Sequence, residues 1–238
     1  MIFTDFIRNI LNFFDYYKQK KILKFINKKY SKPIVIFDVG AHHGETIKIF
    51  QDKINCKKIY SFEASPINFK ILEKNFPNKY LDKLEIYNYG LGDKTTNTFI
   101  NQTLESSSST INDLNVKSKY FFNKLKILNI KNKELFSKKI PINIITLDNF
   151  INEKKIQNID LLKIDTEGYE YNVLKGLNIN HKIIKLIYFE HHYDDMILKN
   201  YKFFDIHKLL MSYGFKKIIK NKMLFRKSFE YVYENQII

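Results

Sequence analysis

Two carboxylates that each close a short apolar segment are the first sign of chemistry in this 238-residue chain. Asp38 ends such a segment in PIVIFDVGAHHGETI, and Glu63 ends another in KKIYSFEAS. Gly40 and Gly44 follow the first acid, where the backbone must turn sharply and can approach a ligand closely. Glu63 comes about 20 residues after that turn, the usual spacing of an acid that binds ribose hydroxyls. The pattern predicts a nucleotide site at the end of a parallel sheet.

The type of nucleotide follows from the residues around the turn. A dinucleotide fingerprint has three glycines, whereas this turn has two, and Asp38 stands just before them. A carboxylate in that place would repel a pyrophosphate and suits a cofactor with a cationic amino-acid tail. S-adenosylmethionine has such a tail, and it also has a ribose for Glu63. The residues therefore favour S-adenosylmethionine as the cofactor.

A second set of polar residues follows two later apolar segments. Asp165 ends IDLLKID, and Glu190 ends IKLIYFE just before His191 and His192. Ligands of doubly wound sheets bind beyond the carboxyl ends of the strands, and imidazole is suited to taking a hydroxyl proton near pH 7. We expect His191 or His192 to be the base, oriented by Asp165 or Glu190. A divalent ion held by Asp165, Glu190 and a histidine is the alternative, but no tight ligand spacing appears, so no metal ligand is assigned.

Lys163 places a cation inside an otherwise apolar segment. An unpaired buried charge is costly, so we expect Lys163 to pair with Glu190 or Glu167. Glu167 itself is expected to begin the next helix, where an acid complements the N-terminal dipole.

Two adjacent histidines stand where the first helix of the sheet region should begin. His42, His43 and Thr46 are expected to line the methionine end of the cofactor, close to free backbone N–H groups. A chance metal site at the two histidines is the alternative. Asp93, in the sequence GLGD, is expected to meet the adenine amino group.

Short apolar segments alternate with helical patterns along most of the chain, which predicts right-handed crossovers and a parallel sheet. A closing antiparallel hairpin follows a glycine at the end of the last helix. The expected strands are 34–39, 58–62, 83–89, 141–145, 159–165 and 184–190, and the expected helices are 44–53, 66–76, 147–154, 168–177 and 201–213.

The pattern divides the chain into an extension and one domain. Residues 1–30 form an expected amphipathic basic helical extension, and 31–238 the catalytic domain. The apolar stripe of the extension is expected to pack on the domain or on a second subunit of a homodimer, with peripheral contact to an anionic membrane as the alternative. The alternation lapses at about 95–140, where we expect a lid or substrate-binding insertion.

Composition limits the partners. The net charge is +15, but all of the 40 basic residues except Arg8 and Arg226 are lysines, so a generally basic surface is favoured over a nucleic-acid face. The single cysteine, Cys56, excludes a disulfide framework. No apolar run is long enough for a membrane span or fits a signal peptide, which favours a cytoplasmic setting.

Later segments add a family resemblance. DVGAHHGETI, SFEASPINFKILEKNF, NYGLGD, ITLDNFI and above all IDLLKIDTEGYEYNVLKG resemble the FkbM-like methyltransferase family, from about Ile34 to Phe225. The resemblance implies a doubly wound, Rossmann-like class I methyltransferase sheet of order 3-2-1-4-5-7-6 with an antiparallel last strand. It also implies methyl transfer from S-adenosylmethionine to oxygen, commonly on a carbohydrate, glycolipid or small metabolite. His42 departs from the family, where asparagine is more usual.

The expected site combines the residues of both acidic groups. Its catalytic candidates are Asp165, Glu190, His191 and His192. Its expected cofactor-binding residues are Asp38, Gly40, Ala41, His42, Gly44, Glu45, Thr46, Glu63, Ala64, Gly90, Asp93 and Asp165. A nucleic-acid methyltransferase, or a non-catalytic binding protein on the same fold, are the competing readings. The proline-aromatic turn typical of base-amine methyltransferases is replaced here by DTEGYE.

Overall fold

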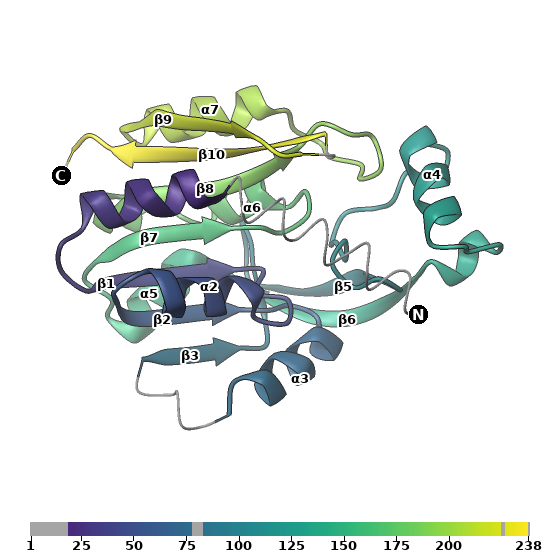
Figure 1. The fold of residues 1–238 in the computed structure, drawn as a ribbon, viewed down its shortest axis with the longest axis horizontal. Helices are drawn as coiled ribbons and strands as arrows, with labels where there is room; N and C mark the ends of the chain where they lie inside the picture. The colour runs from purple at the N-terminus through teal and green to yellow at the C-terminus, as the bar shows by residue number, and fades with distance from the viewer. Residues whose placement is uncertain (1–18, 78–82, 225–226, 238) are drawn as a thin grey trace.

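A seven-stranded sheet forms the centre of the computed structural model, which describes residues 19–77, 83–224 and 227–237 (Figure 1). The strand order is β3-β2-β1-β7-β8-β10-β9, and β10 runs antiparallel to both of its neighbours. When only the strands of this sheet are numbered along the chain, the order is 3-2-1-4-5-7-6, and β10 is the antiparallel last strand. The predicted order and the antiparallel last strand are therefore confirmed. The strands are β1 (Ile34–Val39), β2 (Cys56–Phe62), β3 (Leu84–Tyr87), β7 (Ile159–Ile164), β8 (Ile184–His192), β9 (Phe215–Lys222) and β10 (Ser228–Asn235).

Helices cover both faces of this sheet because its strands carry apolar side chains on both sides. In β1, Phe37 and Val39 join the core on one face, and Ile36 joins the core on the other. The first face is covered by α5 (Leu147–Lys154), α6 (Glu170–Lys175) and α7 (Phe203–Ser212), and the second by the helical residues 19–29, α2 (Glu45–Lys53) and α3 (Pro66–Asn75).

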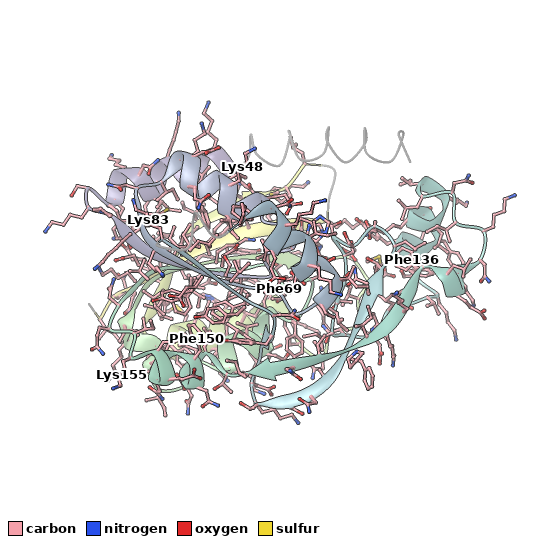
Figure 2. The ribbon with its side chains drawn as sticks, turned by 90° about the horizontal axis from the view of Figure 1, so that it is seen from below. Lys48, Phe69, Lys83, Phe136, Phe150 and Lys155 are labelled. Atoms are coloured by element: carbon pink, nitrogen blue, oxygen red, sulfur yellow. The ribbon has the colours of Figure 1, made fainter. Side chains whose placement is uncertain are left out.

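Aromatic rings fill the first of these cores. Phe150 of α5 lies edge-on to Phe37, Phe62 and Tyr87, with ring centroids 4.9–5.6 Å apart. Figure 2 shows Phe150 in this core, while Phe136 lies in a separate cluster near α4 (Lys119–Ile127). The rings fix the distance between α5 and the strands whose ends carry Asp38 and Glu63.

The segment between β3 and α5 forms a second, three-stranded sheet. It has the order β4-β6-β5, with β4 (Gly90–Leu91), β5 (Thr96–Thr103) and β6 (Ser137–Ile145). The strand expected at 141–145 therefore belongs to this sheet and not to the parallel one, because it pairs antiparallel with β5. Between β5 and β6 lie α4 and the short 3-10 helix η2 (Lys133–Leu135), and Phe121 and Leu125 of α4 pack against Met196 and Ile197.

The described part of the extension packs on the domain. Ile22, Leu23 and Ile26 are buried in the same core as α2, so the inner face of this helix is covered by the domain. Residues 1–18, which carry most of the predicted aromatic stripe, lie outside the described residues. Among the residues described, no helix combines the length and apolarity needed to cross a bilayer.

Two element ends differ from the prediction in ways that affect the site. β8 continues through His192, because its pairing with β10 extends to that residue. The helix expected at 168–177 begins only at Glu170, because Glu167 and Gly168 both have positive φ values, 48° and 93°, and form a left-handed turn. Glu167 is thus not part of the helix, and Glu170 is the acid in its first turn.

Candidate active site

Three charged residues meet at the carboxyl ends of β1 and β7. Lys163 Nζ lies 3.4 Å from Asp38 Oδ1, 3.3 Å from Asp165 Oδ2, and donates a 3.2 Å hydrogen bond to Thr46 Oγ1. Asp38 is the direct neighbour of Lys163 in the parallel register. The expected partners of Lys163, Glu190 and Glu167, were wrong, because the register of the two strands brings Asp38 to it instead.

Burial gives this triad its electrostatic character. Asp38 is fully buried, and burial raises the pKa of its carboxyl despite the opposing charge of Lys163. Burial alone would lower the pKa of Lys163, but Asp165 and Asp38 outweigh it and raise the pKa, so the amine remains a cation. Neither carboxylate oxygen of Asp38 accepts a hydrogen bond from the residues that the structure describes.

The glycine turn lies directly against the end of β7. A Cβ atom on Gly40 would come within 1.9 Å of the Asp165 carbonyl oxygen, and Gly40 has a φ of 87°. The backbone N–H groups of Gly40 and Ala41 both donate to the Phe62 carbonyl, at 2.9 and 3.0 Å. Only glycine meets both constraints, so this turn holds β1, β2 and β7 together at the site.

Glu63 joins the glycine turn to the start of α3. Its Oε2 accepts a 2.8 Å hydrogen bond from the His42 backbone N–H, and its Oε1 accepts one of the same length from Ser65. Burial raises the pKa of Glu63 to about 6, although these two N–H groups oppose the shift. The Asn68 side chain also hydrogen-bonds this carboxylate, whose two oxygens together offer about four acceptor positions, so capacity for a further hydrogen bond remains.

Of the remaining expected cofactor residues, some lie beside other residues of the site, and one is paired with a lysine of α6. Gly90 lies against Ala64, since a Cβ on Gly90 would be 3.3 Å from the Ala64 Cβ. Asp93 forms an ion pair with Lys175 of α6, with 3.3 Å between Oδ2 and Nζ. Thr46 accepts a hydrogen bond from Lys163 of the triad. The carboxylate expected to meet an adenine is therefore already paired with a lysine.

The two adjacent histidines of β8 point to opposite faces of the sheet, since side chains alternate along a strand. His191 lies among aromatic rings on the α7 side, with ring centroids 4.8 Å from Tyr193 and 5.8 Å from Phe203. Burial lowers its pKa to about 3. The structure thus does not bring His191 to the acidic groups of the site, whereas His192 lies among them.

Carboxylates surround His192. Its Nε2 is 3.5 Å from Glu167 Oε2 and 3.6 Å from Glu190 Oε1, and its Nδ1 is 3.5 Å from Asp194 Oδ2. Burial alone would lower the pKa of His192, but the neighbouring acids outweigh it and raise the pKa to about 10. His192 is therefore an imidazolium at neutral pH and does not accept a proton there. Asp165, expected as another ligand of a metal here, faces Lys163 instead.

Glu167 was expected to begin a helix or to pair with Lys163, and the structure places it in this cluster instead. Its non-glycine backbone is held at a φ of 48°, and Thr110 Oγ1 donates to its carbonyl at 2.7 Å. The next carbonyl, that of Gly168, accepts a 3.0 Å hydrogen bond from the Tyr201 hydroxyl. Burial raises the pKa of the Glu167 carboxyl to about 7, although His192 opposes the shift. Strained backbone is common at functional sites. The glycine in DTEG is the sequence signal that could have indicated a turn here in place of the expected helix start.

A family match accompanies this geometry. A model described as "Methyltransferase FkbM domain" matches residues 38–217, which is most of the chain. The chain belongs to the FkbM methyltransferase domain family. The resemblance predicted from its motifs is confirmed. A search of curated proteins finds no match.

Solved structures agree on the fold. Methyltransferase FkbM from Methylobacillus flagellatus KT superposes with a TM-score of 0.53 at 15% identity, over 84% of this chain and 44% of that one. The chain thus spans less than half the length of that protein. Magnesium protoporphyrin IX methyltransferase (ChlM) from Synechocystis PCC 6803, solved with bound SAM, gives a TM-score of 0.50 at 8% identity, over 92% and 80% of the two chains. The class I methyltransferase fold is confirmed.

The contrast between the two histidines is directly measurable by NMR titration of their imidazole nitrogens. We expect His191 to stay neutral down to about pH 3 and His192 to keep its proton up to about pH 10. Glu167→Gln removes one of the carboxylates that stabilise the His192 cation and should lower the pKa of His192. Glu153→Gln, at an exposed position of α5, is the control and should leave the pKa of His192 unchanged. Titration of both histidines near 6.5, the ordinary value, would contradict this description.

Proposed function

We propose that the chain is an S-adenosylmethionine-dependent O-methyltransferase that acts on a hydroxyl of a carbohydrate, glycolipid or small metabolite. The observation that carries the cofactor is the buried carboxylate of Asp38 at the glycine turn, which is ion-paired with Lys163 and accepts no hydrogen bond from the described residues. A cationic ammonium group would supply the missing donors. A pyrophosphate would be repelled by the same carboxylate.

The other end of the cofactor fits the acid of β2. Glu63 accepts hydrogen bonds from His42, Ser65 and Asn68, and its carboxylate keeps acceptor capacity for a ribose hydroxyl. Ala64 and Gly90 pack closely together and leave little side-chain bulk beside it, which suits the flat ring of an adenine. Asp38, Gly40, Ala41, Glu63, Ala64 and Gly90 would hold S-adenosylmethionine, which supplies a methyl group on a sulfonium when bound.

The protein must also orient the acceptor oxygen and take its proton. Alignment alone can contribute on the order of 7–11 kcal/mol in favourable cases. We assign the proton to Glu167, since its pKa of about 7 suits a base near neutral pH. His192 would stay protonated and hold Glu167 and Glu190 in place as a cation between them. A histidine base, expected from the sequence, is the alternative.

A hydroxyl acceptor is favoured over nucleic acid by the environment of this carboxylate. Thr110 and Asn112, from the loop after β5, donate to the carbonyls of Glu167 and Gly168 and so place a polar strip beside the turn. The turn itself has the sequence DTEG and lacks the proline-aromatic pair with which base-amine methyltransferases stack a base. Methyl transfer to a glycan and metabolite panel, with RNA alongside, separates the two acceptor classes.

Glu63→Ala should weaken S-adenosylmethionine binding measured by calorimetry. Hydrogen bonds to a charged group contribute about 1.5–3 kcal/mol, which corresponds to roughly 10- to 150-fold in Kd. Glu85→Ala, on the neighbouring strand β3, is the matched control and should bind as the parent protein does. Absence of binding in the parent protein, or equal binding in Glu63→Ala, would contradict the cofactor assignment.

Glu167→Gln should reduce kcat by about 10²- to 10⁴-fold, the usual contribution of a general base, while S-adenosylmethionine binding persists. The pH profile of kcat in the parent protein should rise through about pH 7 as the Glu167 carboxyl ionises. Glu153→Gln, at an exposed position of α5, is the control. Full turnover in Glu167→Gln combined with a loss in His192→Gln would instead favour the histidine base.

A further inference from the structure

Three side chains at the beginning of α2 have the chemistry of metal ligands. His42, His43 and Glu45 each offer one donor atom, and these atoms all lie within 4.8 Å of one another. Among the described residues, this is the group of histidine, cysteine and carboxylate side chains that meets such a distance limit. The group lies at the glycine turn, and the charged partners of His192 are other residues, namely Glu167, Glu190 and Asp194.

The spacing within the group is close to that of a coordination sphere. His42 Nδ1 lies 3.1 Å from Glu45 Oε1 and 3.3 Å from Glu45 Oε2. Ligands about 2.0–2.1 Å from a tetrahedral ion are roughly 3.3 Å from each other. The His43 ring stacks on the His42 ring, with centroids 3.7 Å apart and a 20° angle between the planes. Since the ligand atoms of both rings and of the carboxylate lie within 4.8 Å of one another, rotation of one ring out of the stack would direct both nitrogen lone pairs at a single ion.

The other nitrogen of His42 has the partner that a ligating histidine commonly has. His42 Nε2 lies 2.7 Å from Ser106 Oγ, in the loop after β5. If Nε2 carries the proton and donates it to this hydroxyl, the Nδ1 lone pair faces the carboxylate of Glu45. Two acceptors at that distance repel unless a proton or a cation lies between them. Metal-bound histidines usually donate their second N–H to an oxygen in this way.

Both residues of this contact have strained backbones. His42 has a φ of 51° and Ser106 a φ of 60°, conformations that side-chain-bearing residues rarely adopt. The Ser106 carbonyl accepts hydrogen bonds from the Ser109 hydroxyl at 2.7 Å and the Ser109 backbone N–H at 3.1 Å, which fix the loop. Strain of this kind persists when the surrounding structure holds it and is frequent at binding sites.

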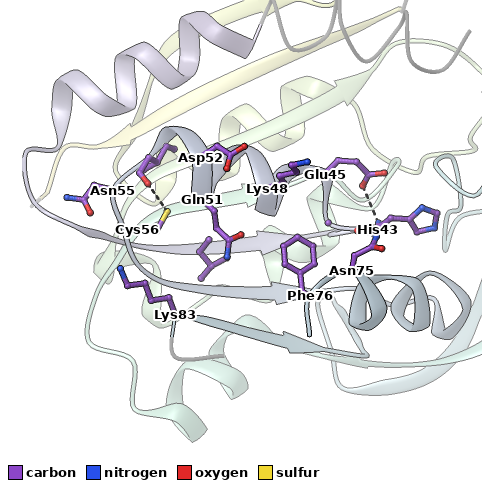
Figure 3. Close-up of a pocket in the computed structure, with 13 residues that line it drawn as sticks. His43, Glu45, Lys48, Gln51, Asp52, Asn55, Cys56, Asn75, Phe76 and Lys83 are labelled. Carbon is purple, nitrogen blue, oxygen red and sulfur yellow. Dashed lines mark hydrogen bonds between the residues drawn. The ribbon is translucent and has the colours of Figure 1, made fainter. Parts of the chain in front are cut away.

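The group opens into a groove on the outer face of the domain. A cavity of about 890 Å³ runs along α2, from His43 and Glu45 at one end to Cys56 and Lys83 at the other (Figure 3). Asp38, Glu63 and Asp165 are not among its lining residues. His43 and Glu45 of the group thus border a cavity that is distinct from the lining of the cofactor site.

We propose that His42, His43 and Glu45 bind a divalent transition-metal ion of the zinc class, with Ser106 as the residue that positions His42. Two imidazoles and one carboxylate favour Zn²⁺, Co²⁺ or Ni²⁺ over Mg²⁺ and Ca²⁺, which prefer oxygen ligands. The carboxylate charge of Glu45 offsets the positive end of the α2 dipole, which would otherwise disfavour a cation. Three protein ligands leave a coordination position open toward the groove.

The test uses the full chain after removal of metal with a chelator. Titration calorimetry with Zn²⁺ should show one equivalent bound, and Co²⁺ should give the visible absorption of a low-coordinate site, which Zn²⁺ but not excess Mg²⁺ abolishes. His43→Asn and Glu45→Gln should each weaken Zn²⁺ binding at least about tenfold. Ser106→Ala, which removes only the partner of His42, should weaken it roughly 10- to 100-fold.

His181→Asn is the matched control, because this histidine lies in a different part of the fold, against Tyr213. It should bind Zn²⁺ as the parent protein does. The proposal is overturned if the parent protein binds no stoichiometric Zn²⁺, if both His43→Asn and Glu45→Gln bind it with unchanged affinity, or if His181→Asn loses binding to the same extent. Circular dichroism of each variant ensures that a loss of binding is compared between folded proteins.

Discussion

The buried ion triad of Asp38, Lys163 and Asp165 is the constraint on which the site depends. Lys163 is a cation in the middle of the sheet, and it is tolerated there because two carboxylates lie 3.3–3.4 Å from its amine. The same contacts bring the ends of β1 and β7 together beside the Gly40 turn, where backbone passes so close to Asp165 that no side chain fits. A requirement for charge balance inside the sheet thereby also shapes the pocket in which a cationic cofactor tail would be held.

A second balance of charges governs the proposed chemistry. His192 lies between Glu167 and Glu190. Burial disfavours the charged form of each group, and the opposite charge nearby favours it. For His192 the carboxylates prevail and raise its pKa to about 10, whereas for Glu167 burial prevails and raises the carboxyl pKa to about 7. The histidine that resembles a base in the sequence is thus a fixed cation, and the glutamate that resembles a helix-capping residue becomes the group able to exchange a proton near neutral pH.

Most of the fold could be predicted from the sequence because alternation and glycine spacing are local signals. They predicted the parallel strands and the placement of Asp38, Glu63 and Asp165 at one edge. The partner of Lys163 depends on the register between β1 and β7, which are distant in the chain. The separation of His191 from His192 depends on how far β10 extends β8. The strand at 141–145 belongs to another sheet because β5 pairs with it. Each of these outcomes rests on long-range pairing, which no local pattern records.

Lys163 stabilises the domain by compensating the buried negative charge of Asp38. A double-mutant cycle, with unfolding measured in urea, tests this most directly. Lys163→Met should lower the free energy of unfolding by about 3–5 kcal/mol, since it leaves a buried carboxylate without its cation. Asp38→Asn combined with Lys163→Met should recover part of that loss, giving a coupling energy between about 0.5 and 3 kcal/mol. A Lys163→Met protein as stable as the parent, or strictly additive effects of the two substitutions, would contradict the account.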